Sequence, residues 1–157
     1  MNFKKTTLST MGIISLISVG SMSYAEGDID AGQKAFNKCK SCHMVVSPEG
    51  EEFVKGGKTG PNLYGVIGRA VASQEGFKYG KPILSLSDSD LVWTEEELAN
   101  YITDPKAWLV EKTGDKKARS KMSFKLNKEQ EDVAAYLATF SPVVEETVST
   151  EEVSETK

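Results

Sequence analysis

The chain of 157 residues has only one histidine and two cysteines, and all three lie in the five-residue stretch from Cys39 to His43. A structural zinc site takes four protein ligands, so here it would need a carboxylate beside these three side chains. A thioredoxin-like dithiol belongs at the start of a helix that follows a strand, and no strand pattern precedes Cys39. A zinc site and a redox dithiol therefore each lack a part that they need.

The sequence also lacks an apolar run of the roughly 20 residues that a membrane-spanning helix needs. It starts with lysines at positions 4 and 5 and a short, mostly apolar run over residues 11–19. The small-x-small pattern Ser23-Tyr24-Ala25 follows, and a signal peptidase cleaves after such a pattern. We therefore predict a cleaved secretory signal peptide over residues 1–25, in preference to a retained membrane anchor.

The end of the chain has no aromatic residue and no periodicity. From Pro142 onward it carries five glutamates and one lysine. A segment with so much charge and so little apolar surface does not build a packed core. We predict that residues 142–157 form a disordered acidic tail, which leaves residues 26–141 as one domain.

The sequence also lacks a run of alternating apolar and polar residues that is long enough to predict a strand. Its patterns predict three helices instead. They run from about residue 28 or 30 towards 39, from 94 to 105, and from 127 to 140. Thr94 and Glu97 have the spacing of a capping box. The third helix is predicted to bury Val133, Tyr136, Leu137 and Phe140. Short helices and long loops give a small domain a poor core, so it needs a staple, a metal or a large buried cofactor.

Covalent haem attachment requires two cysteines and a histidine with the spacing found in the stretch from Cys39 to His43. Cys39 and Cys42 would add to two vinyl groups as thioethers, which holds His43 under the iron. Export permits a disulfide instead, but only the haem also supplies the missing core. We predict one haem c, because a second haem has no attachment site.

Methionine is scarce too, since removal of the signal peptide leaves only Met44 and Met122. Met44 is adjacent to His43 and cannot reach the opposite face of a haem. Met122 is therefore the predicted sixth iron ligand, and the alternative is an open iron site. Ligation by histidine and methionine raises the reduction potential and suits electron transfer.

Four stretches, "FNKCKSCHMV", "GGKTGPNLYGVIGR", "EGFKYG" and "KMSFKL", occur in the order found in class I cytochromes c. Over residues 27–141 the chain resembles this family, and especially the periplasmic cytochrome c-550 and cytochrome c2 types of proteobacteria. The resemblance implies a small all-α class I cytochrome c fold, with three to five short helices and long loops wrapped around one covalently bound haem c.

The resemblance also implies roles for single residues. Pro61 should accept the Nδ1–H of His43 through its carbonyl group, as a partner that orients the ligand. Tyr101 matches the tyrosine near the methionine sulfur, and Phe124 matches the aromatic residue beside the exposed haem edge. Three more residues match positions that hydrogen-bond a buried haem propionate, namely Arg69, Tyr79 and Trp93. The first helix should contact the last one through Gly32 and Phe36 on one side and Val133 and Tyr136 on the other.

The segment from Lys106 to Lys128 has eight positive and only two negative residues, and it brackets Met122 and Phe124. A basic rim at the haem edge would steer acidic docking faces of redox proteins towards it. Its cations are Lys106, Lys112, Lys116, Lys117, Arg119, Lys121, Lys125 and Lys128.

The expected function is that of a soluble, monomeric, periplasmic one-electron carrier that is not an enzyme and binds neither nucleic acid nor the membrane interior. It would take electrons from a cytochrome bc1-type complex. It would pass them to a terminal oxidase, a peroxidase or nitrogen-oxide reductase, or a photosynthetic reaction centre. Two alternatives remain: a haem enzyme or gas sensor with an open sixth iron position, and the electron-accepting partner of a periplasmic dehydrogenase.

Overall fold

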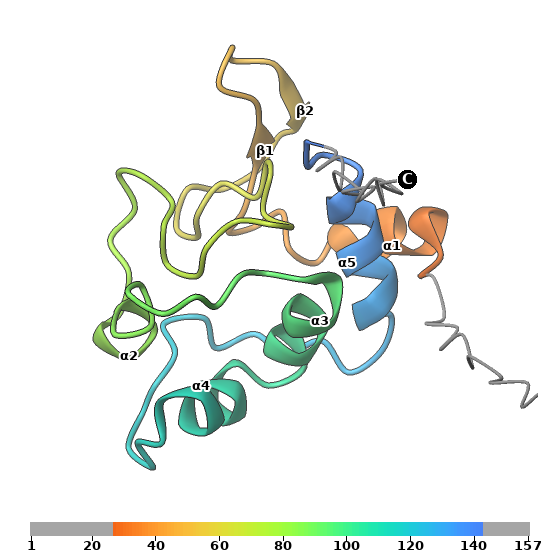
Figure 1. Cartoon of the computed structure of the whole chain (residues 1–157). Coiled ribbons are helices and arrows are strands. Elements are labelled where there is room, and N and C mark those ends of the chain that lie inside the picture. The colour runs from red at the N-terminus through yellow and green to blue at the C-terminus, as the bar shows by residue number, and fades with distance from the viewer. Residues whose placement is uncertain (1–26, 143–157) are drawn as a thin grey trace, which may run out of the picture.

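The structure, a computed structural model, describes residues 27–142 (Figure 1). The predicted signal peptide (1–25) lies outside the described residues, and so does the predicted acidic tail apart from Pro142. Within residues 27–142, five helices and one small antiparallel hairpin are joined by long loops. The elements are α1 (Ile29–Phe36), β1 (Val45–Val46), β2 (Glu52–Val54), α2 (Lys81–Leu84), α3 (Glu95–Thr103), α4 (Pro105–Thr113) and α5 (Gln130–Ala138). The predicted class of short helices and long loops is confirmed.

Helices α1 and α5 cross at close range (Figure 1). Gly32 lies at the crossing, where an added Cβ atom would be 1.9 Å from the carbonyl oxygen of Asp132. Beside it, the fully buried Phe36 packs against Tyr136 with ring centroids 5.6 Å apart. The predicted contact between the first and last helices is therefore confirmed, and it explains why a glycine occupies the middle of α1.

The second predicted helix is present as α3, but only half of its capping box forms. The hydroxyl of Thr94 accepts the backbone N–H of Glu97 at 3.0 Å. The Glu97 carboxylate does not reach back to Thr94, because it accepts hydrogen bonds from Trp108 at 2.7 Å and from Lys112 at 2.6 Å. A residue of the first turn of α3 thus connects α3 to α4.

Helix α4 was not predicted, because Pro105 was interpreted only as the end of α3. The carboxylate of Asp104 accepts the backbone N–H of Ala107 at 3.0 Å and so caps a new helix. Proline is well tolerated at the first helical position, where its missing N–H has no intrahelical partner. Gly114 ends α4 in the left-handed conformation at φ 69°.

The last helix, α5, begins later than predicted. Glu129 has a left-handed backbone with φ 67°, so the helix starts only at Gln130. Buried residues run without a break from Val133 to Leu137, because α5 packs against both α1 and α3. Phe140, which was predicted to be buried, is only partly buried against the core.

The hairpin of β1 and β2 was not predicted either. Val45 and Val54 pair across it and are both buried, but the strands have only two and three residues. Runs of that length are too short for an alternating pattern to be recognised. Among residues 27–142, the helices are all too short to cross a membrane as apolar spans.

Candidate functional site

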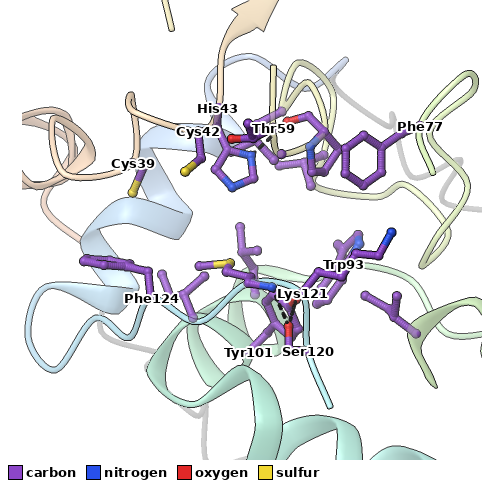
Figure 2. A pocket seen from close by; sticks show the side chains of 18 of the residues that line it. Cys39, Cys42, His43, Thr59, Phe77, Trp93, Tyr101, Ser120, Lys121 and Phe124 are labelled. Atoms are coloured by element: carbon purple, nitrogen blue, oxygen red, sulfur yellow. Dashed lines mark hydrogen bonds between the residues drawn. The ribbon is translucent and has the colours of Figure 1, made fainter. Parts of the chain in front are cut away.

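A mostly apolar cavity of about 290 Å³ lies between the stretch from Cys39 to His43 and the loop that follows α4 (Figure 2). In Figure 2, Cys42 and His43 lie on one wall, and Tyr101 and Ser120 lie on the wall opposite. All ten site residues predicted from the sequence line this cavity, namely Cys39, Cys42, His43, Pro61, Arg69, Tyr79, Trp93, Tyr101, Met122 and Phe124. The fold thus brings together residues that are up to 85 positions apart in the sequence.

The two cysteines lie in the turns that follow α1. The backbone N–H groups of Cys42 and His43 both donate to the carbonyl oxygen of Cys39, at 3.1 and 3.0 Å, so the stretch is compact. Burial raises the pKa of Cys39 to about 11. Hydrogen bonds with Thr59 and Ser41 lower the pKa of Cys42. No disulfide joins Cys39 and Cys42.

His43 is held in one orientation. Its Nδ1 lies 2.9 Å from the carbonyl oxygen of Pro61, the contact that the family resemblance implies. Burial lowers the pKa of His43, although the hydrogen bond with Pro61 opposes the shift. The ring points into the cavity in Figure 2, and a neutral imidazole fixed through Nδ1 presents Nε2 as its ligating atom.

Gly60 also fixes this ring, and the sequence did not reveal it. An added Cβ atom at Gly60 would lie 2.3 Å from Cε1 of His43, so only glycine leaves room for the imidazole. The signal was present only as one glycine among several in "GGKTGPNLYG", and its meaning depends on a contact with a residue 17 positions away.

On the opposite wall, Met122 is partly buried against the core. Its backbone N–H donates to the hydroxyl of Ser120 at 3.0 Å, and this hydroxyl is 3.1 Å from the phenol oxygen of Tyr101. Burial raises the pKa of Tyr101, which keeps the phenol protonated and able to donate. Sequence reasoning identified Tyr101 and Met122 but missed Ser120 between them.

Arg69 supplies a positive charge at the cavity without a carboxylate partner among the described residues. Its guanidinium donates to Gln74 and to the backbone carbonyl groups of Tyr64 at 3.2 Å and Asn62 at 3.0 Å. Burial lowers the pKa of Arg69, although the neighbouring Tyr79 opposes this shift. A part-buried guanidinium of this kind suits an anionic group bound in the cavity.

Trp93 lies in an aromatic cluster behind the cavity. Its ring stacks on Trp108 with centroids 5.1 Å apart and meets Tyr101 edge-on, also at 5.1 Å. Lys112 lies over the Trp108 ring at 5.8 Å. Trp108 was not predicted to take part, because it lies on the helix that sequence reasoning missed.

These side chains fit a covalently attached haem. Two cysteine sulfurs, an adjacent imidazole, a thioether on the facing wall and a part-buried cation surround one mostly apolar cavity. Among residues 27–142, no group of three or more His, Cys, Asp or Glu side chains is arranged to hold a metal ion by itself. The chemistry of the donors therefore favours haem over zinc.

Known proteins with similar sequences and structures agree with this reading. Cytochrome c-550 of Paracoccus pantotrophus is 64% identical over 119 residues, which are 74% of this chain and 89% of that protein. Cytochrome c2 of Rhodobacter capsulatus is 56% identical over 113 residues, which are 72% of this chain and 82% of that protein. No protein-family model matches the chain.

The solved structure of ferric cytochrome c-550 from Paracoccus versutus has a TM-score of 0.72 and 62% sequence identity, and the match covers 74% of this chain and all of that one. The chain belongs to the cytochrome c-550 and cytochrome c2 family. As a cytochrome c it carries one covalent haem c, and Cys39 and Cys42 have the spacing of its attachment motif. The resemblance and the cofactor predicted from the sequence are thus confirmed, and the general role is that of an electron carrier.

Proposed function

We propose that this cytochrome c is a periplasmic one-electron carrier whose haem iron is ligated by His43 and Met122. One observation carries the proposal: the imidazole fixed by Pro61 and the loop that bears Met122 line the same cavity from opposite walls. Haem c supplies the one-electron iron couple. With the thioether of Met122 as its second protein ligand, the iron would have a raised reduction potential and no open position for a substrate.

The polar residues of the cavity serve to hold the haem propionates. Arg69, Tyr79 and Trp93 all line the cavity, and the propionate charge would provide the anionic partner that Arg69 lacks among the described residues. Arg69 is already oriented by two backbone carbonyl groups. A guanidinium fixed in this way loses little conformational entropy when it pairs with a carboxylate.

Docking of redox partners would take place where Phe124, 41% exposed, comes to the surface beside the cavity. Arg119 and Lys121 also line the cavity. Fewer cations of the basic segment are available for docking than its sequence suggests, because two of its lysines already have carboxylate partners. Lys112 pairs with Glu97, and Lys125 pairs with Asp104. Arg119 and Lys121 therefore remain the cations best placed to meet an acidic partner at the haem edge.

The proposed donor is a cytochrome bc1-type complex, and the proposed acceptors are a terminal oxidase, a peroxidase or nitrogen-oxide reductase, or a photosynthetic reaction centre. A periplasmic location follows from the predicted signal peptide over residues 1–25. Purified holoprotein should therefore be oxidised by at least one solubilised acceptor preparation of this kind, at a second-order rate that falls as salt rises.

The sixth ligand decides between a carrier and the alternative of a haem enzyme or gas sensor. The oxidised protein should show the weak near-infrared charge-transfer band of methionine ligation. Met122→Ala should abolish this band, lower the reduction potential and allow carbon monoxide to bind the reduced protein. Ready binding of carbon monoxide to the unmutated protein would favour the sensor or enzyme instead.

A further inference from the structure

Residues 119–125, here called the methionine loop, run between two buried anchors, Ala118 and Leu126, which are 1% and 3% exposed. Leu126 is fixed by a backbone hydrogen bond to Ile102 at 2.8 Å. Between the anchors, no backbone group of residues 119–125 forms a backbone–backbone hydrogen bond with another described residue. Side chains must therefore hold the loop in place.

The two halves of the loop are held unequally. Before Met122, Ser120 contacts Tyr101 at 3.1 Å, and Lys121 donates to the carbonyl oxygen of Lys78 at 2.8 Å. After Met122, residues 123–125 are exposed. In this half, the described residues offer one side-chain tether to the rest of the protein, the ion pair of Lys125 with Asp104 at 2.5 Å.

Asp104 is well placed to anchor the loop, because the fold already fixes its carboxylate. It lies at the junction where α3 ends and α4 begins, and its Oδ1 accepts the backbone N–H of Ala107 at 3.0 Å. Its other oxygen, Oδ2, faces Lys125. Only the lysine side chain has to be ordered to form the pair, which reduces the entropic cost that weakens most exposed ion pairs.

We propose that Asp104 is a positioning residue for Met122: its ion pair with Lys125 closes the second half of the methionine loop and thereby keeps the thioether on the iron. The inference rests on the proposed ligation by Met122 and adds to it the group that stabilises the closed loop. Without the pair, Ser123, Phe124 and Lys125 would be free to move away from α4 with no buried side chain to hold them until Leu126.

The test measures how often the loop opens, with imidazole as the probe. Imidazole binds the ferric iron only when the methionine has detached, so its apparent Kd reflects the population of the open loop. Asp104→Asn removes the charge but keeps an equally good N-cap for α4. It should lower the apparent Kd for imidazole two- to fivefold, because an exposed ion pair stabilises the closed loop only modestly.

Lys125→Gln should have the same effect, and the double variant should bind imidazole no more tightly than either single variant, because both remove one interaction. The matched control is Glu129→Gln, which breaks the exposed pair of Lys38 and Glu129 at 3.3 Å, a pair that involves no residue of the methionine loop. It should leave the apparent Kd unchanged. Salt should lower the apparent Kd of the unmutated protein but not that of Asp104→Asn.

The failures of the two proposals can be told apart. If the unmutated ferric protein lacks the methionine charge-transfer band, ligation by Met122 is wrong and this inference falls with it. If the band is present but Asp104→Asn binds imidazole as the unmutated protein does, or no more tightly than Glu129→Gln does, Asp104 is only a helix cap and the positioning role is refuted.

Discussion

Replacement of Gly32 by alanine, at the crossing of α1 and α5, should have two effects of opposite sign on the stability of the protein. Replacing a glycine by alanine in an exposed helix interior stabilises a protein by about 1 kcal/mol. At Gly32, however, the added Cβ atom would lie 1.9 Å from the carbonyl oxygen of Asp132 and 2.9 Å from Cβ of Tyr136. The oxygen belongs to the backbone of α5, so no side-chain rotation can make room.

The helices would have to separate by about 1 Å or more to reach an ordinary contact distance. A gap of that size forfeits a quarter to a half of the dispersion attraction between facing atoms. The loss falls on Phe36 and Val133, which are 0% and 2% exposed. Overpacking typically costs about 1–3 kcal/mol, and the upper end applies here because the clash is with backbone. After subtraction of the helix-propensity gain of about 1 kcal/mol, we expect Gly32→Ala to destabilise the protein by about 2 kcal/mol.

The assay is unfolding in guanidinium chloride, followed by tryptophan fluorescence, which the haem quenches in the folded protein. Gln33→Ala is the matched control, since it introduces the same side chain at the next, exposed position of α1. The free energy of unfolding of this control should lie within about 0.5 kcal/mol of the unmutated value. If Gly32→Ala proved as stable as the control, close packing would not be the reason for a glycine at this position.

Three further predictions concern the haem, the docking face and acid stability. The mature protein should have the mass of the chain from Glu26 plus one haem, and acid-acetone should fail to extract the pigment; free haem in the extract would contradict covalent attachment. Arg119→Glu should slow oxidation by an acidic partner at low salt more than at high salt, whereas Lys55→Glu, which does not line the cavity, should not; equal slowing would exclude docking at the haem edge. The ion pair with Lys125 lowers the pKa of Asp104 in the folded protein, so the unfolded chain binds more protons as the pH falls below about 4. Stability should therefore decline as the pH falls through the folded pKa. Asp104→Asn should make this decline shallower, as measured by unfolding between about pH 5 and pH 2, and an unchanged pH profile would refute the contribution of the pair.

The predictable parts of the fold were those with a local cause. Thr94 and the stripe around Val133 specify helices α3 and α5 from neighbouring residues alone. Helix α4 was not predicted because a proline such as Pro105 is compatible with two positions: it can end one helix, and it is favoured at the first position of the next. Asp104, one residue earlier, is a good N-cap residue and could have decided between them.

The residues that line the cavity were predictable for a different reason. Cys39, Cys42 and His43 carry their chemistry in their spacing, and Met122 was left by elimination from a methionine-poor chain. Gly60 and Ser120 could not be found in this way, because each acts on a partner that only the fold brings near. The carboxylate of Glu97 was likewise predicted to complete a capping box with Thr94. It instead accepts hydrogen bonds from Trp108 and Lys112, which α4 brings beside it.

The two walls of the haem cavity differ in how they are built, and this difference bears on function. On the histidine wall, backbone hydrogen bonds fix the turn from Cys39 to His43, and Pro61 and Gly60 fix the ring. The methionine loop depends on side chains alone, two of them exposed lysines. Segments with few buried contacts and few backbone hydrogen bonds open first. Under the proposed ligation by His43 and Met122, the iron would therefore lose its thioether well before its imidazole. If Met122 ligates the iron as proposed, the stability of the methionine loop would decide whether small ligands are excluded from the iron.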